Sequence, residues 1–226
     1  MIPGYLTRLL ADAPVVESDY GPARLECRTI GELHLPSGRV VACDPLVEPD
    51  ARPFEVAAAP GRYPVWLGIA RLPGGDERIA AAWLRLADGT PVRWEPAALH
   101  GRPDLEEPAY GVVSGTGAFV SAEAAPLLAA ALDGDFADEV ATAMDANYVD
   151  TRNWAVLPVP GSAELNFAAF SSGMGDGAYA SYWGRDAEGR PVCLLTDFDI
   201  LKLSRAEAEA EAERDRATAK PWWKLW

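Results

Sequence analysis

The side chains of this 226-residue chain that could do acid–base or ligand chemistry lie where glycine or proline fixes the backbone. Asp44 ends an apolar, β-branched run and precedes a proline. Asp176 and Tyr179 stand in the segment Ser172 to Tyr179, whose alternating glycines permit positive φ and close backbone approach. A carboxylate held at a strand end can contact a ligand, or it can cap a turn through its own backbone. Both interpretations stay open for Asp44 and Asp176.

A second glycine-rich segment, Gly111 to Phe119, offers the hydroxyls of Ser114 and Thr116 as ligand contacts. A phosphate loop needs a strand, a glycine turn and a helix N-terminus in sequence, together with a lysine. Here no lysine follows the glycines, and a strand-like run comes before the next helix. A β-bulge or close backbone packing explains these glycines equally well.

The sequence gives little support for a metal site or for a catalytic set of the Ser-His-Asp or Cys-His kind. Asp197 joins Asp176 in a group of carboxylates that could bind Ca²⁺ or Mg²⁺, but the D-x-D-x-D-G pattern of a calcium loop is absent. His34 and His100, the two histidines, stand in a strand-like segment and a proline-rich loop, so we expect neither to be catalytic. We therefore expect no catalytic residue, no metal and no cofactor. The cysteines (Cys27, Cys43 and Cys193) are far apart in the chain, and we expect reduced, buried thiols.

The charge balance narrows the class of partner. The chain has 34 acidic and 20 basic residues, a formal net charge of −14. Residues 204–226 hold five acids and five bases, so the whole net charge belongs to residues 1–203. Nucleic acid is not expected as a partner, because binding phosphates requires clustered Lys and Arg. No apolar run reaches the ~18 residues of a membrane span, and the first ten residues show no signal-peptide pattern. We expect a cytoplasmic protein whose partner is another protein, and a basic protein is the candidate that the charge favours.

Period-two hydrophobic patterns predict a β-rich body. Pro36 to Gly38 predicts a hairpin between the strands on either side of it, and Asp88-Gly89 predicts another. Tyr110 to Val120 is predicted to be one strand interrupted by glycines, and Phe54 and Val56 to share a short strand. The other predicted strands cover residues 25–35, 39–43, 63–71, 78–86, 92–95, 154–159, 165–171, 179–184 and 192–197.

Helical patterns are fewer. Residues 3–12 show helical spacing, and a helical insert is expected near residues 121–146, with Ser121 capping its start and Asp135 capping a second helix. We therefore predict an α+β fold, mainly antiparallel β-sheet, with one domain over residues 1–203. The capping box that begins at Ser204 predicts an appended charged helix over residues 204–226.

Three tryptophans, Trp222, Trp223 and Trp226, lie within the last five residues of the chain. Exposed indole surface is costly in water, so these side chains are expected to be buried against something. The body of this protein, a protein partner and a membrane interface are the three alternatives. Because two lysines and a few apolar residues give only weak membrane affinity, we expect a protein surface and treat the segment as a partner-binding tail.

Four blocks of sequence together resemble an uncharacterised bacterial family, domain of unknown function 4241, over about residues 25–203. They are Ser37 to Leu46 (SGRVVACDPL), Pro60 to Val65 (PGRYPV), Tyr110 to Phe119, and Ser172 to Tyr179 followed by Tyr182-Trp183-Gly184 and Thr196-Asp197-Phe198. The resemblance implies a bacterial, cytosolic α+β protein with a shared surface around Asp44 and Asp176, but no reaction. Family members carry acidic residues beside the central Gly-Thr-Gly, where this chain has Val113-Ser114 and Val120-Ser121. Any carboxylate chemistry of that block would be lost here.

Two hypotheses of function follow. The first is a non-enzymatic acidic interaction module, immunity-like or regulatory, since the body is acidic and no nucleophile–base set is evident. The second is a hydrolase or small-ligand-binding enzyme that uses Asp44 and Asp176 in a glycine-lined cleft, with Cys43 or Tyr179 assisting. The second requires Asp44, Gly115 to Gly117 and Asp176 to converge on one pocket.

Overall fold

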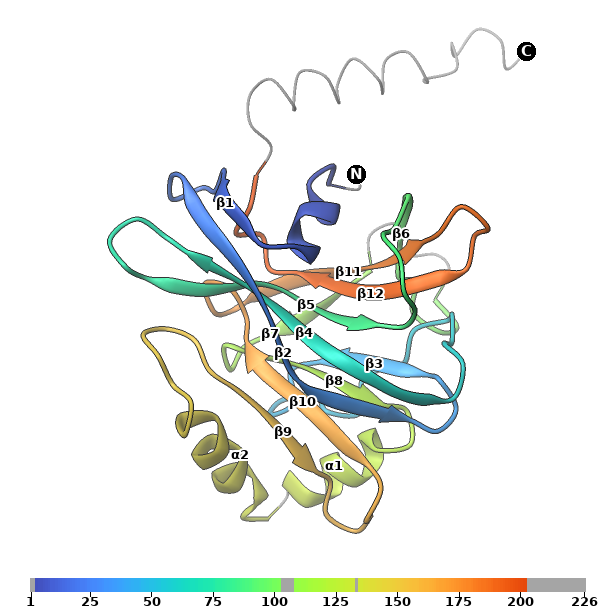
Figure 1. Ribbon diagram of the computed structural model, residues 1–226. Helices are drawn as coiled ribbons and strands as arrows, with labels where there is room; N and C mark the ends of the chain where they lie inside the picture. The colour runs from blue at the N-terminus through green and yellow to red at the C-terminus, as the bar shows by residue number, and fades with distance from the viewer. Residues whose placement is uncertain (1–2, 103–107, 133, 203–226) are drawn as a thin grey trace, which may run out of the picture.

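Two antiparallel β-sheets packed face to face form the body of the protein (Figure 1). The computed structural model describes residues 3–102, 108–132 and 134–202. The elements, in chain order, are the 3₁₀ helix η1 (Leu6–Leu10), β1 (Ala13–Val16), β2 (Ala23–Leu35), β3 (Val40–Cys43), β4 (Gly61–Arg71), β5 (Glu77–Arg85), β6 (Arg93–Pro96), β7 (Ala109–Val112), β8 (Thr116–Ser121), α1 (Ala125–Leu132), α2 (Phe136–Asp145), β9 (Trp154–Pro158), β10 (Asn166–Ser171), β11 (Gly177–Arg185) and β12 (Pro191–Asp197).

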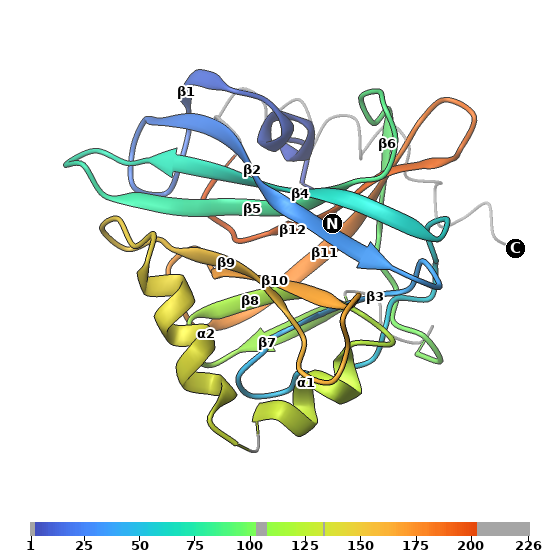
Figure 2. The ribbon, with the colours of Figure 1, turned by 60° about the horizontal axis from the view of Figure 1, so that its bottom comes forward.

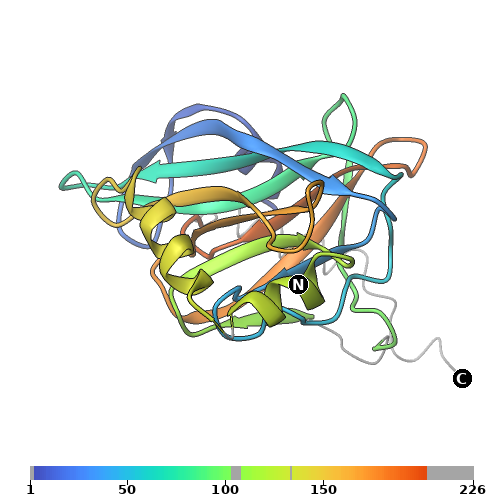
Figure 3. The same cartoon turned by 90° about the horizontal axis from the view of Figure 1, so that it is seen from below.

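The larger sheet has the strand order β1-β2-β4-β5-β12-β11-β6, and β7 also pairs with β11. The smaller sheet has the order β3-β8-β10-β9. Helices α1 and α2 cover the outer face of the smaller sheet, and η1 lies on the outer face of the larger one (Figures 2 and 3). The predicted α+β class with mainly antiparallel sheet is confirmed.

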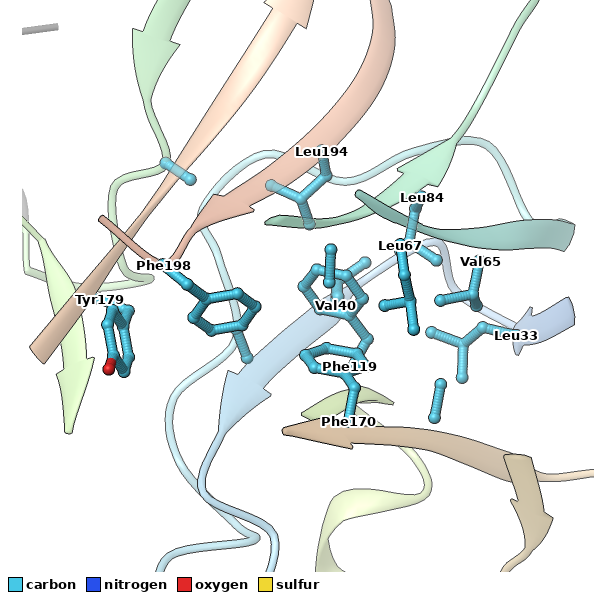
Figure 4. Close-up of a cluster of buried hydrophobic side chains, with 14 of the residues drawn as sticks. Leu33, Val40, Val65, Leu67, Leu84, Phe119, Phe170, Tyr179, Leu194 and Phe198 are labelled. Atoms are coloured by element: carbon cyan, nitrogen blue, oxygen red, sulfur yellow. The ribbon is translucent and has the colours of Figure 1, made fainter. Parts of the chain in front are cut away.

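The main hydrophobic core lies between the two sheets. Leu33, Leu67 and Leu84 of the larger sheet face Phe119 and Phe170 of the smaller one, and each is fully buried (Figure 4). The two phenylalanine rings meet edge to face, with centroids 5.3 Å apart. Burying a side chain of this size contributes roughly 1.5–3 kcal/mol, so this layer is the main reason that the sheets stay together.

The predicted hairpin around Pro36 to Gly38 is wrong. The turn forms, with the Gly38 N–H donating to the Leu35 carbonyl at 3.2 Å, but it carries the chain from one sheet to the other. β2 pairs with β1 and β4, whereas β3 pairs with β8. All four residues of β3 are buried, because Val40 and Ala42 face the core between the sheets, while Val41 and Cys43 face the core under the helices.

Three other predictions need correction. The hairpin at Asp88-Gly89 does not form, because β12 occupies the edge of β5 and β6 pairs with β11. Phe54 makes only an isolated bridge with Leu99, so the strand predicted for Phe54 and Val56 is absent. Helical structure within residues 3–12 is limited to the one short 3₁₀ helix, since Pro14 and the strand β1 follow closely.

The predicted strand from Tyr110 to Val120 is two strands that belong to different sheets. β7 pairs with β11 and β8 pairs with β3 and β10, so the chain changes sheet over residues 113–115. The Asp44 carboxylate, which accepts hydrogen bonds from Val113 and Ser114, holds this change of sheet in place.

The helical insert is where the sequence predicts it. Ser121 ends β8, and its hydroxyl accepts the Ala124 N–H at 3.1 Å, which caps the turn leading into α1. Asp135 occupies the N-cap position of α2, although its carboxylate makes no capping hydrogen bond. Within residues 3–102, 108–132 and 134–202, no helix has the length and apolar character needed to cross a bilayer. The helix predicted for residues 204–226 and the tryptophans within it lie outside the described residues.

Candidate functional site

The Asp44 carboxylate is the centre of the candidate site. It is 1% exposed and accepts four hydrogen bonds. Oδ2 accepts the backbone N–H groups of Val113 (2.9 Å) and Ser114 (2.8 Å). Oδ1 accepts the Ser114 hydroxyl (2.7 Å) and the Leu46 N–H (3.0 Å). The carboxylate therefore fixes the break between β7 and β8 as well as the turn that follows β3.

The two glycine-rich segments lie side by side next to this carboxylate. The Ser172 N–H donates to the Gly115 carbonyl at 3.0 Å, and a Cβ built on Gly115 would lie 3.9 Å from the Gly175 Cα. Ser172 also closes its own turn, because its hydroxyl donates to the Gly175 carbonyl at 2.9 Å. The two glycine-rich segments thus meet beside Ser114, which binds Asp44, whereas the Asp44 carboxylate itself is buried and makes no contact with Asp176.

Tyr179 lies beneath that turn. Its hydroxyl donates to the Gly175 carbonyl at 2.8 Å and lies 3.2 Å from the Ser172 carbonyl. Its ring packs edge to face on Phe198, with centroids 5.0 Å apart (Figure 4). Burial is the main cause of a raised pKa for this phenol. The hydroxyl therefore stays protonated at neutral pH and holds the turn closed.

Asp176 and Thr116, the other two candidates in these segments, differ from each other in exposure. Asp176 is exposed, and its carboxylate has no hydrogen-bond or ion-pair partner among the residues that the structure describes. Thr116 is buried at the start of β8, opposite Ser171. Asp176 thus lies at the surface of the turn, while Thr116 lies inside the sheet.

Asp197 lies on the other face of the larger sheet. Alternation along β12 directs Phe198 into the core between the sheets and Asp197 toward η1, where Oδ2 accepts the Tyr5 hydroxyl at 2.7 Å. Oδ1 accepts the Asp199 N–H at 3.1 Å. Burial is the main cause that raises the pKa of Asp197 to about 7. Asp197 is therefore separated from Asp44 and Tyr179 by the sheet itself.

A small cavity lies between Tyr110, Tyr179 and Ala42, two residues before Asp44 in the chain. Its volume is about 10 Å³, roughly the room that one water molecule needs. It is too small for a substrate of several atoms.

A buried ionic cluster near this turn was missed by sequence reasoning. The Arg152 guanidinium Nε donates to Glu77 Oε2 at 2.7 Å, with side chains 6% and 9% exposed, and Arg71 binds the other carboxylate oxygen. Arg152 also covers the Trp154 ring, at 4.9 Å from its centroid. The residue before Arg152, Thr151, has a φ of 72°. Because β-branched residues rarely adopt a positive φ, the sequence does not predict this conformation, and no other local pattern marks the cluster.

The remaining candidates for chemistry have separate partners. His100 Nδ1 lies 2.7 Å from Glu55 Oε2, and His34 Nδ1 lies 3.1 Å from the Glu164 carbonyl. In the described part of the chain, no group of three His, Cys, Asp or Glu side chains could hold a metal ion. The cysteines are unpaired: Cys43 and Cys193 are buried and Cys27 is half-buried, with burial the main cause that raises each thiol pKa.

Comparison with known proteins supports the resemblance found in the sequence. No curated protein and no solved structure matches the chain. One family model, described as "Protein of unknown function (DUF4241)", matches residues 33–196. This range includes Asp44, both glycine-rich segments and the ionic cluster, and it covers most of the two sheets. The chain therefore belongs to the DUF4241 family.

Proposed function

We propose that this protein is a non-enzymatic interaction module that binds a basic protein partner through the outer face of its helices. The observation that carries the proposal is the composition of residues 121–151, which we call the acidic helical layer. This stretch contains no Lys, Arg or His. It contains seven acidic residues: Glu123, Asp133, Asp135, Asp138, Glu139, Asp145 and Asp150.

Helix packing directs this charge outward. Phe136, Val140 and Met144 recur at helical spacing along α2 and are buried against the smaller sheet. The opposite side of the helix carries Asp138 and Asp145, which are both exposed. α1, which has no charged residue, and α2 lie together over one face of the smaller sheet (Figure 3), so the exposed acids of α2 lie on the same outer surface as α1.

The fold does not explain all of this charge. Carboxylates at the N-terminus of α2, such as Asp138 and Glu139, are favourable because the helix dipole is positive there. Asp145 is the last residue of α2, where the dipole repels a carboxylate. It has no ion-pair partner among the described residues. A basic partner would supply the missing counter-charge.

The layer also exposes apolar side chains beside its acids. Leu127 is 36% exposed, Tyr148 is 56% exposed and Val149 is 45% exposed. Protein interfaces commonly combine an aromatic or aliphatic anchor with a charged rim. This combination favours a protein partner over a small cation, and neutralising such a partner fits an immunity-like or regulatory role.

The second candidate function, an enzyme that uses Asp44 and Asp176, has one observation in its favour: the two glycine-rich segments converge beside Asp44. Against it stand the four hydrogen bonds that already occupy the Asp44 carboxylate. A general base must have a free lone pair within reach of its substrate. The interaction module therefore accounts for more of the molecule.

The test compares two triple variants of the full chain. One neutralises the layer (Asp138→Asn, Glu139→Gln, Asp145→Asn), and the other removes the same charge from exposed acids elsewhere (Glu17→Gln, Glu32→Gln, Glu164→Gln). The probe is a synthetic 20-residue peptide rich in lysine and arginine, and its affinity is measured by fluorescence anisotropy at low and physiological salt. We expect the layer variant to bind at least tenfold more weakly and the control to bind within threefold of the wild type.

Equal weakening by both variants would mean that only the overall charge attracts the peptide, and the proposal would be overturned. The enzyme hypothesis has a separate readout. Hydrolysis of ester, phosphate or peptide model substrates that depends on Asp176 would support it and would leave the peptide affinities unchanged.

A further inference from the structure

A groove opens on the outer face of the larger sheet, on the side away from the helices. Its volume is about 340 Å³. Its floor includes Trp66 and Trp83, whose rings stack with centroids 6.0 Å apart and an interplanar angle of 14°. Its walls come from η1 and the turn that follows it, from the 89–91 segment and from the start of β12. They are formed by Thr7, Leu10, Ala11, Gly89, Pro91 and Cys193, among others.

One polar atom at the groove has no partner. The Trp66 indole Nε1 is buried and has no acceptor among the described residues. The nearby Trp94 shows the usual arrangement, because its Nε1 donates to the Thr7 hydroxyl at 3.0 Å. Buried indole N–H groups normally find an acceptor. The groove therefore has an aromatic floor, and one of its two indoles has an N–H group without an acceptor among the described residues.

We infer that this groove is the docking site for residues 221–226 of the same chain, Pro-Trp-Trp-Lys-Leu-Trp. The described chain ends on the correct side of the sheet. The Lys202 N–H donates to the Glu17 carbonyl at 3.1 Å, and Leu201 belongs to the same hydrophobic cluster as Trp83 and Cys193. Figure 1 shows η1 and these last described residues together above the larger sheet.

The length of chain beyond Lys202 is sufficient for this contact. Cys193 at the groove and Lys202, where the described chain ends, are nine residues apart, so at most roughly 32 Å separates them. The 18 residues from 203 to 220 can span up to about 60 Å when extended. The segment therefore reaches the groove without requiring any movement of the sheet.

The chemistry of the segment complements that of the groove. Its three indoles need apolar surface, and the stacked pair Trp66 and Trp83 offers an aromatic face.

The experiment places a photo-cross-linker in the full-length protein. Trp223 is replaced by benzoylphenylalanine, the sample is irradiated at low concentration, and the cross-linked peptides are mapped by mass spectrometry. We expect cross-links to peptides that contain Trp66, Trp83 or Pro91, in a product with the mass of one chain. Cross-links only in a product of twice that mass, cross-links to other surfaces, or no cross-links would each overturn the inference.

A paired variant tests the groove itself. Ala11→Arg with Thr90→Arg places two bulky positive charges at exposed positions on the groove, which should repel Lys220 and Lys224 and abolish the cross-links, while Ala11→Ser with Thr90→Ser should retain them. If the charged variant fails to fold, competition replaces it: a synthetic peptide of residues 218–226 in excess should reduce cross-linking of the parent protein at least fivefold. The triple variant of the acidic helical layer should cross-link normally, so this inference and the proposed function can fail separately.

Discussion

The Asp44 carboxylate accepts backbone N–H groups from Val113 and Ser114, residues 69 and 70 positions later in the chain. The contact joins the end of β3 to the point where the chain leaves the larger sheet and enters the smaller one. A carboxylate that satisfies several buried donors is costly to remove, because those donors are left without acceptors.

We predict that Asp44→Asn destabilises the protein by roughly 2–4 kcal/mol, because the amide NH₂ would face N–H donors instead of accepting from them. Urea unfolding followed by tryptophan fluorescence measures the change. Asp176→Asn, at an exposed carboxylate in the neighbouring turn, is the matched control and should shift the free energy of unfolding by less than about 0.5 kcal/mol. Similar effects from the two variants would contradict the assigned role of Asp44.

Asp197 predicts a pH dependence of stability. Its folded-state pKa, raised to about 7 by burial, lies above the ordinary value of 3.8. The native state therefore binds more protons than the unfolded state between about pH 4 and pH 7, so stability falls as the pH rises through this range. From pH 5 to pH 8 this group should cost the wild type about 2–3 kcal/mol.

Asp197→Asn, which keeps an acceptor for the Tyr5 hydroxyl, should remove this pH dependence. Thermal melting of both proteins at several pH values gives the comparison. Parallel stability curves for the two proteins across this pH range would show that Asp197 does not titrate as stated.

Because Arg152 and Glu77 form a buried ion pair, removing one partner should lower the free energy of unfolding strongly. Arg152→Met should cost roughly 3–5 kcal/mol, because it leaves the Glu77 carboxylate with less compensation in a buried site. The exposed pair of Arg190 and Asp186 serves as the control, and Arg190→Met should cost under about 1 kcal/mol. Chemical denaturation distinguishes the two, and a small cost at Arg152 would show that Arg71 alone satisfies Glu77.

Asp145 predicts opposite changes in stability and binding. Asp145→Asn removes a carboxylate from the C-terminal end of α2 and should stabilise the protein by about 0.3–1 kcal/mol. The same variant should weaken binding to the basic peptide, because the layer loses a charge. Asp138→Asn, at the other end of the helix, should weaken binding and reduce stability slightly. A stabilising effect at both ends would indicate general charge repulsion instead of a dipole effect.

The sequence predicted the strands far better than their partners. Period-two patterns locate most strands to within a few residues, because the alternation reports burial, which is a local property. Pairing depends on the other cores that a strand must contact, and β3 shows this clearly. Val40 and Cys43 face different cores, one between the sheets and one under the helices, and β3 pairs with β8 although a turn joins it to β2.

The candidate site was predictable in its residue types and not in its geometry. Asp44 before proline and the glycines near Ser114 and Ser172 are recognisable by type and spacing. Their convergence depends on the change of sheet at residues 113–115, which no local pattern encodes. The Arg152 and Glu77 pair was invisible for a similar reason, because its partners are 75 residues apart and an isolated arginine in a loop is usually exposed.

The turn at Gly38 bears on how this fold can change over evolutionary time. With the breaks after β3, β7 and β10, it makes the chain alternate between the sheets, so neither sheet is a contiguous stretch of sequence. Neither sheet can be inherited, duplicated or exchanged as a unit without rebuilding the other. Insertions are tolerated most easily at hairpin ends such as residues 186–189, because added residues there leave every connection between the two sheets unchanged. We expect relatives to differ mainly at those ends.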